Sequence, residues 1–138
     1  MRYLVQQKSS HTSAPLTYEE WKSILADAPL PAGLVDLDAF DRNIHLFVRA
    51  LREAGGKQTI RLATKSVRVP ALIKRVLDTD PLFQGLMVYC ATEAEFLARE
   101  GFDDLLIAYP TVQPNDLRIV RELHEQGKTV RLMIDSLE

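Results

Sequence analysis

A regular alternation between short apolar runs and longer segments with the apolar spacing of amphipathic helices constrains the fold most. The apolar runs occupy residues 33–37, 59–64, 84–91, 104–109 and 129–134. They begin 20–26 residues apart, which is typical of a repeated strand–helix unit. Because the runs are almost continuously apolar, we expect strands that are covered on both faces, and such strands form parallel sheets. The sequence therefore predicts an α/β fold built from parallel β/α repeats.

Local signals predict where the helices between these runs begin and end. Thr17 with Glu20 three residues later forms a capping-box pattern, and Thr92 with Glu95 forms another. Asp38 is expected to cap the helix that follows the first apolar run. The other boundaries are predicted by prolines suited to a first turn and by glycines that end a helix: Pro70, Pro114, Gly55, Gly101 and Gly127.

Two architectures fit five such units. A flavodoxin-like open sheet is complete with five strands. A TIM-type (β/α)8 barrel needs about 250 residues, and this chain has 138. The pattern alone therefore favours the open sheet by a small margin. In both architectures ligands bind at the carboxyl ends of the strands, so the residues at these ends carry the functional argument.

Composition narrows the classes of function. The net charge of −2 gives no electrostatic reason to expect nucleic acid or an anionic membrane as a partner. No apolar run approaches the roughly 18 residues of a membrane span. Residues 1–15 are polar, lack the apolar core of a signal peptide and are interpreted as a mobile arm. With Cys90 as the only cysteine, no disulfide can form within the chain, and a cytoplasmic location is expected. The three histidines lie far apart without ligand spacing, so no metal site is expected within the chain.

Lys65 is the strand-end residue with the clearest chemistry. It directly follows the apolar run at 59–64, so its ammonium group is expected at the ligand end of the sheet. A lysine held near apolar groups or other cations becomes a nucleophile that can form a Schiff base. Arg61 and Arg68 are close in sequence and would attract a phosphate group. The common alternative for such a lysine is a solvated surface residue.

Other polar residues have structural interpretations beside functional ones. Asp36 lies inside the first predicted strand, where we expect it to pair with a buried cation such as Arg61. Tyr89 and Tyr109 end two later strands. We expect them to pack in the core with the hydroxyl group at the rim, and contact with a substrate is the second interpretation. Cys90 is interpreted as a small core residue.

Several short motifs, taken in order, resemble the fold-type III enzymes that use pyridoxal 5′-phosphate (PLP), the alanine racemase-like barrels. Residues 35–40, Val-Asp-Leu-Asp-Ala-Phe, resemble the segment that opens this barrel, and residues 61–65, Arg-Leu-Ala-Thr-Lys, fall where the family has its PLP lysine. Four further segments resemble the later strand–helix units of this family: residues 92–95, 101–104, 106–110 and 130–136. The pattern is most similar to that of D-threonine aldolase and D-serine dehydratase-like proteins.

The resemblance implies that the chain forms about the first five strands of a (β/α)8 barrel and that Lys65 is the catalytic lysine bound to PLP. It also implies that Arg61 and Asp36 belong to the cofactor site. The substrate would be a small-molecule (D-)amino acid, and the enzyme a lyase or isomerase: an aldolase, racemase or deaminase. The cofactor supplies the electron sink, and the protein chooses the bond that breaks. A homodimer is expected.

The chain also departs from the D-threonine aldolase pattern. Ala63 stands where a histidine is usual, and residues 66–68 are Ser-Val-Arg where Thr-His-Lys is usual, which leaves the substrate and the reaction open. In the family, later strands hold the phosphate, and a C-terminal β-domain supplies metal ligands. We therefore interpret residues 31–138 as a partial barrel after a short helix at 16–30. This part is expected to bind PLP weakly, with a divalent metal only in a full-length enzyme.

Two alternatives remain open. One is a PLP-binding homeostasis protein that keeps the lysine and the barrel without turnover. The other is a self-contained flavodoxin-like binding domain with Lys65 on its surface.

Overall fold

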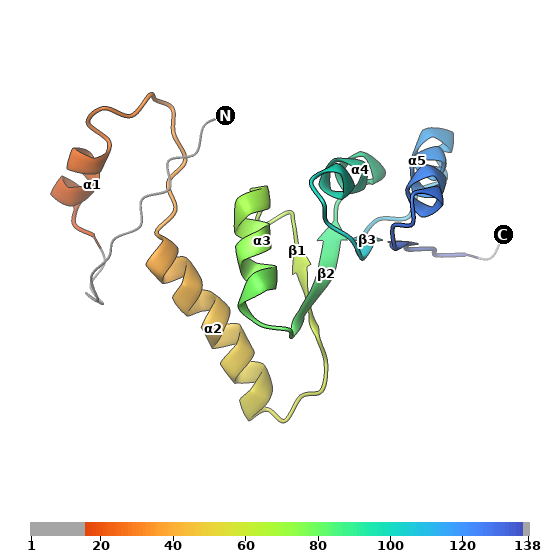
Figure 1. Cartoon of the computed structure of the whole chain (residues 1–138), viewed down its shortest axis with the longest axis horizontal. Coiled ribbons are helices and arrows are strands. Elements are labelled where there is room, and N and C mark those ends of the chain that lie inside the picture. The colour runs from red at the N-terminus through yellow and green to blue at the C-terminus, as the bar shows by residue number, and fades with distance from the viewer. Residues whose placement is uncertain (1–15, 137–138) are drawn as a thin grey trace. The chain divides into compact units, whose positions relative to one another are not determined.

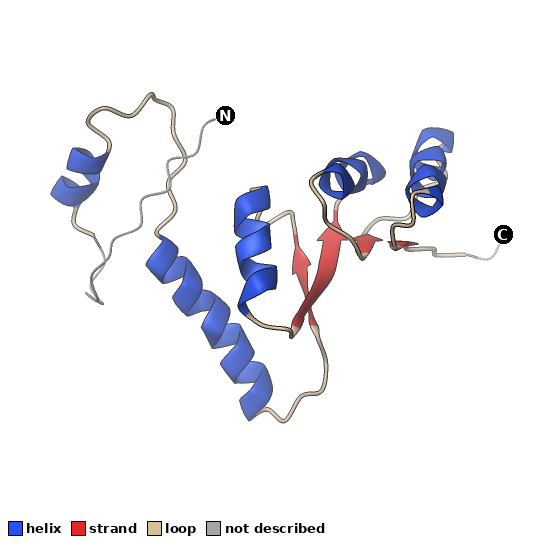
Figure 2. Cartoon of the chain, in the orientation of Figure 1, coloured by secondary structure: helices blue, strands red, loops and turns tan. Residues whose placement is uncertain are grey.

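The computed structural model describes residues 16–136, so the arm predicted at residues 1–15 lies outside the described residues. The elements, in chain order, are α1 (Tyr18–Ile24), α2 (Leu37–Glu53), β1 (Ile60–Ala63), α3 (Pro70–Thr79), β2 (Phe83–Val88), α4 (Ala91–Arg99), β3 (Leu105–Ile107), α5 (Pro114–Glu125) and β4 (Val130–Leu132) (Figures 1 and 2). The chain divides into two units, residues 1–46 and 47–138, and the second unit contains the sheet. None of the helices in the described part is long and apolar enough to cross a membrane.

The four strands form one parallel sheet in the order β1-β2-β3-β4. Each strand is joined to the next by one helix, so the prediction of an α/β fold with parallel repeats is confirmed for three strand–helix units and a fourth strand. Because crossovers between parallel strands are right-handed, a consecutive strand order places α3, α4 and α5 on the same side of the sheet. Figure 1 shows these three helices beside the strands.

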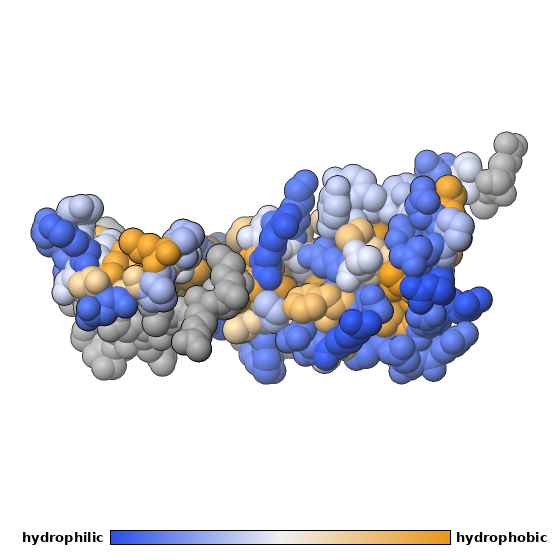
Figure 3. All heavy atoms as spheres, turned by 90° about the horizontal axis from the view of Figure 1, so that it is seen from above, coloured by the Kyte–Doolittle hydropathy of each residue, from blue (hydrophilic) through white to orange (hydrophobic). Residues whose placement is uncertain are grey.

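The core lies between this side of the sheet and the three helices. Its buried side chains are Ile73 of α3, Leu86 and Val88 of β2, Ala94 and Leu97 of α4, Leu105 and Ile107 of β3, Ile119 and Leu123 of α5, and Val130 of β4. Seen from above the view of Figure 1, the visible surface is largely hydrophilic, with apolar patches between the hydrophilic side chains (Figure 3). The helices therefore bury one apolar face each and present charge outward.

The opposite face of the sheet, which we term the open face, is not covered in the same way. Ala63, Met87, Leu106 and Arg131 occupy it at one level, because the strand ladders pair these residues across the sheet. Met87 is 39% exposed, and Arg131 is also exposed. The prediction that the strands are covered on both faces therefore does not hold within residues 16–136.

Several local predictions are confirmed. Thr17 caps α1 in a capping box with Glu20, whose carboxylate accepts the Thr17 N–H at 2.8 Å. Pro70 and Pro114 each open a helix, and the glycines that follow three helices adopt positive φ: Gly55, Gly101 and Gly127.

The first predicted strand, at 33–37, is wrong. Residues 33–36 belong to no helix or strand, and the chain enters α2 at Leu37. Asp36 rather than Asp38 caps this helix, because its Oδ1 accepts the Ala39 N–H at 2.8 Å. An apolar run becomes a strand only where a neighbour completes its hydrogen bonds, and here the aspartate side chain serves a helix end instead.

The second capping box, Thr92 with Glu95, is also wrong. α4 begins one residue earlier, at Ala91, and Cys90 occupies the cap without a hydrogen bond from its side chain to a backbone N–H of the first turn. The Thr92 hydroxyl contacts the Cys90 Sγ at 3.1 Å instead. β2 passes into α4 within two residues, so the helix start follows from the strand end rather than from the threonine.

Candidate functional site

Lys65 lies in a turn that directly follows β1, at the carboxyl end of the sheet. The residue before it, Thr64, is fully buried, and both its N–H (3.0 Å) and its Oγ1 (3.2 Å) donate to the Met87 carbonyl of β2. The Val67 N–H closes the turn on the Thr64 carbonyl at 3.1 Å. Thr64 therefore anchors the turn to the neighbouring strand, while Lys65 itself is exposed.

The Lys65 side chain has no hydrogen bond or ion pair with another residue of the described chain. Two other lysines do have such partners. Lys74 binds the Asp78 carboxylate at 3.0 Å, and Lys128 donates to the Phe102 carbonyl at 3.0 Å. The Lys65 backbone carbonyl, however, accepts a hydrogen bond from the Arg68 Nε at 3.4 Å. An amine that is not held by a carboxylate is free to react with a carbonyl compound.

Tyr89 and Tyr109 lie at the carboxyl ends of the next two strands. Ala63 pairs with Met87 in the β1–β2 ladder, so Lys65 and Tyr89 each follow this pair by two residues. The Tyr89 and Tyr109 rings meet edge to face, with their centroids 5.3 Å apart and their planes at 69°. Each tyrosine is 53% exposed, so the prediction that they pack in the core is wrong. They form a half-open aromatic pair at the same end of the sheet as Lys65.

Arg61 is not brought to Lys65. Its Nη2 donates to both carboxylate oxygens of Asp104, at 3.0 and 2.9 Å, and its Nη1 donates to the Asp104 carbonyl at 2.6 Å. Asp104 immediately precedes β3, so the Arg61 guanidinium lies toward the amino end of the sheet, whereas Lys65 lies at the carboxyl end. The expected pairing of Arg61 with Asp36 is therefore wrong, and the Asp36 carboxylate serves as a helix cap.

A second arginine, Arg131 of β4, also binds the Asp104 carboxylate. Sequence reasoning missed both Asp104 and Arg131. One feature of the sequence could have indicated them. Arg61 interrupts the apolar run at 59–64 and Arg131 the run at 129–134, and a charged residue within a strand needs a partner of opposite charge. We call these three residues the Arg61–Asp104–Arg131 cluster.

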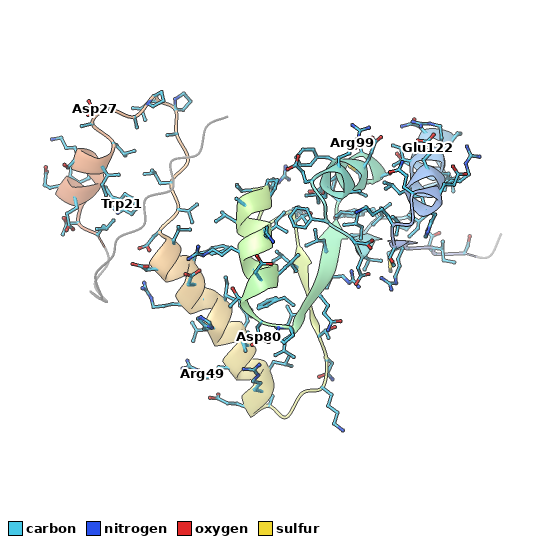
Figure 4. The ribbon with its side chains drawn as sticks, in the orientation of Figure 1. Trp21, Asp27, Arg49, Asp80, Arg99 and Glu122 are labelled. Carbon is cyan, nitrogen blue, oxygen red and sulfur yellow. The ribbon has the colours of Figure 1, made fainter. Side chains whose placement is uncertain are left out.

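The other ion pairs differ from this cluster because most join exposed residues within one helix. Arg99 of α4 binds Glu95 at 2.6 Å, and Glu122 of α5 binds Arg118 at 2.6 Å; Figure 4 labels one member of each pair. Arg52 of α2 reaches Asp80 after α3 at 2.8 Å. Exposed pairs of this kind contribute little to stability. Within residues 16–136, no group of three or more His, Cys, Asp or Glu side chains is arranged to hold a metal ion.

Comparison with known proteins adds no further constraint. A scan against models of protein families finds no match, and a search of curated proteins finds no significantly similar sequence. The residues at the strand ends, and the sheet that positions them, are therefore the evidence on function.

Proposed function

We propose that this chain is the first part of a (β/α)8 barrel enzyme that acts on amino acids with PLP, and that Lys65 is its cofactor lysine. The observation that carries the proposal is an exposed lysine without an ion-pair partner in the described chain, at the carboxyl end of a parallel sheet. Reactive groups of barrel enzymes come from this end of the strands.

The strand order supports a barrel over the flavodoxin-like alternative. A flavodoxin-like sheet has the order 2-1-3-4-5, which reverses direction and sends helices to both faces. The order β1-β2-β3-β4 has no reversal. A sheet that continues in this manner keeps its helices outside and closes on its open face.

The side chains of the open face also suit a barrel interior. In (β/α)8 barrels the inward-pointing residues of the strands stack in layers. Here Arg61 and Asp104 bind each other toward the amino end, and Ala63, Met87, Leu106 and Arg131 follow at the next level, from which Arg131 reaches back to the Asp104 carboxylate. Lys65 and Tyr89 come last, at the end where a substrate would enter. Polar contacts at the amino end stabilise such a fold, and the carboxyl end carries its chemistry.

The residues present fit the aldehyde group of PLP. Lys65 would hold the cofactor through its Nζ, and Thr64 fixes the turn from which that side chain projects. When bound, PLP supplies the electron sink for breaking a bond at the Cα of an amino acid. The Lys65 amine would then hold the proton that leaves or returns to that Cα. The phosphate would be held by strands that follow β4 in a complete barrel.

The test is trapping with borohydride. PLP is added to the protein, the absorbance near 420 nm is recorded, and the product is reduced and mapped by peptide mass spectrometry. We expect the adduct on Lys65, its loss in Lys65→Gln, and its persistence in Lys57→Gln, which removes another exposed lysine. Labelling spread evenly over the surface lysines would refute the cofactor role.

Turnover separates an enzyme from a PLP-binding homeostasis protein. We expect the complete protein to release an aldehyde or keto acid from a D-amino acid, or to invert its configuration. An adduct on Lys65 without any of these reactions, in a protein that contains the whole barrel, would favour the homeostasis protein.

We also propose self-association. In the described chain, β1 and β4 each have a strand on one side only, and unpaired strand edges favour pairing between molecules. The 138-residue chain by itself should therefore associate, whereas in a complete barrel further strands would pair with both edges. Sedimentation velocity should then show a dimer, and a monomer at all concentrations would contradict this part of the proposal.

A further inference from the structure

The Tyr89–Tyr109 pair leaves aromatic ring surface exposed at the carboxyl end of the sheet. The two rings already contact each other at 5.3 Å, yet each residue keeps 53% of its surface exposed. Tyrosine rings bury large areas and gain from contact with a further aromatic ring. The pair therefore has ring surface left to contact a ligand.

Apolar residues stand close to both tyrosines in the sequence. Met87, which precedes Tyr89 by two residues on the open face, is 39% exposed, and Ala108 lies between β3 and Tyr109. The nearest acidic group in sequence, Glu93, is already engaged, because its Oε2 accepts the Tyr89 N–H at 2.6 Å. This bond also ties the Tyr89 backbone to the first turn of α4. An apolar ligand surface suits this environment better than a charged one.

We propose that the Tyr89–Tyr109 pair is a binding surface for a flat aromatic ring at the carboxyl end of the sheet, level with Lys65. This inference rests on the proposed function, since the ring would belong to a molecule that reacts with Lys65. Two sources share the chemistry: the pyridine ring of the cofactor and the aromatic side chain of an amino acid substrate. In both cases the ligand ring packs against tyrosine rings that are half exposed.

The first experiment measures ring binding without any reaction at Lys65. The full chain, with tyrosine rings labelled with carbon-13, is titrated with pyridoxine, which has the pyridine ring but no aldehyde. Separate titrations use D-phenylalanine and, as an aliphatic control, D-leucine. Shifts of the Tyr89 and Tyr109 ring signals with pyridoxine identify the cofactor ring as the ligand, and shifts with D-phenylalanine alone identify the substrate ring. Equal responses to all three compounds, or no response, would overturn the proposal.

The second experiment measures the preference of Lys65 for aromatic aldehydes. Lys65 Nζ attacks the aldehyde carbon, water leaves, and borohydride delivers hydride to the resulting C=N bond, which leaves a stable secondary amine. The trapping rate at Lys65 is compared for pyridoxal and for propanal. In Tyr89→Leu and Tyr109→Leu we expect the ratio of these rates to fall about two- to ten-fold, the effect of losing one aromatic contact.

Matched variants complete the second experiment. Phe96→Leu removes an aromatic ring that is 49% exposed on α4, and it should leave the ratio unchanged. Tyr89→Phe keeps the ring and should retain the ratio. A ratio that is equal in all variants would overturn the aromatic surface.

The two proposals fail in different ways. If pyridoxine shifts the tyrosine signals but no aldehyde labels Lys65, the ring surface stands and the cofactor role of Lys65 fails. If Lys65 is labelled selectively while the tyrosine signals stay unchanged, the cofactor role stands and the ring surface fails. The titration uses the unchanged protein, so it decides the question even if a leucine variant unfolds.

Discussion

Arg61 and Asp104 bind each other across the sheet, although β2 lies between β1, which contains Arg61, and β3, which begins directly after Asp104. The Arg61 guanidinium donates to both oxygens of the Asp104 carboxylate and to the Asp104 carbonyl. Arg131 of β4 approaches the same carboxylate from the other side. One carboxylate therefore connects β1 with β4, which are not neighbours in the sheet, through charge-assisted hydrogen bonds, which are stronger than bonds between neutral groups.

Asp104→Asn tests the contribution of this cluster. Asparagine tolerates the positive φ of 54° at this position, so the substitution removes charge without straining the backbone. We expect the free energy of unfolding in urea to fall by about 1–3 kcal/mol. The lower part of this range applies, because the two side chains are 28% and 33% exposed and water screens them. The loss should shrink in 1 M salt.

Asp78→Asn is the matched control for this prediction. It removes the carboxylate of the Lys74–Asp78 pair, whose side chains are 70% and 61% exposed. We expect little change in stability, because exposed pairs within a helix contribute little. Equal effects of the two substitutions would show that the cluster is no more than a surface ion pair.

Gly85→Ala should destabilise the sheet through a steric conflict. Gly85 has a φ of +67°, and a Cβ atom there would overlap the Arg61 guanidinium and the Asp104 carboxylate. Gly55 has nearly the same φ, +65°, but open space around it, so Gly55→Ala measures the backbone cost alone, about 1 kcal/mol. We expect Gly85→Ala to cost clearly more in urea unfolding. If both variants lose the same stability, the close approach of Arg61 to Gly85 is not a constraint.

The sequence predicted those features of the fold that depend on neighbouring residues. Pro70 and Pro114 fix the backbone angle of a first helical turn, and the glycines after three helices supply positive φ, so both signals act within a few residues. The position of Lys65 after a strand was predictable for the same reason, because an apolar run followed by a charged residue marks a strand end.

Features that depend on distant partners were not predictable. Arg61 is 43 residues from Asp104, and nothing local selects this carboxylate over Asp36. The run at 33–37 has the composition of a strand, but a strand also needs a partner that completes its hydrogen bonds. The exposure of Tyr89 and Tyr109 likewise depends on which face of the sheet the helices cover. Pairing across the sheet, rather than residue type, decided each of these cases.

Asp36→Ala tests which aspartate caps α2. The Asp36 Oδ1 accepts the Ala39 N–H, so its loss should cost about 1 kcal/mol and speed hydrogen exchange at the Ala39 amide. Asp36→Ser should retain most of the protection, because serine also caps helices. Asp38→Ala removes only a favourable charge in the first turn and should change exchange less. Faster exchange at Ala39 in Asp38→Ala than in Asp36→Ala would contradict the observed cap.

Thr64→Val tests whether the buried threonine positions Lys65. Valine fills a similar volume and keeps the N–H bond to the Met87 carbonyl, but it loses the hydroxyl bond of 3.2 Å. We expect a loss of about 1 kcal/mol in stability. Because this bond holds the turn that carries Lys65, the trapping rate of PLP at Lys65 should also fall.

Thr79→Val is the control for Thr64→Val. Thr79 donates its hydroxyl to the Arg75 carbonyl at 2.7 Å, near the end of α3, so its substitution removes a comparable bond outside the Lys65 turn. It should lower stability to a similar extent and leave trapping at Lys65 unchanged. A solvated lysine without a built environment would react at the same rate in all three proteins. Slower trapping in Thr64→Val alone therefore distinguishes a positioned nucleophile from an ordinary surface residue.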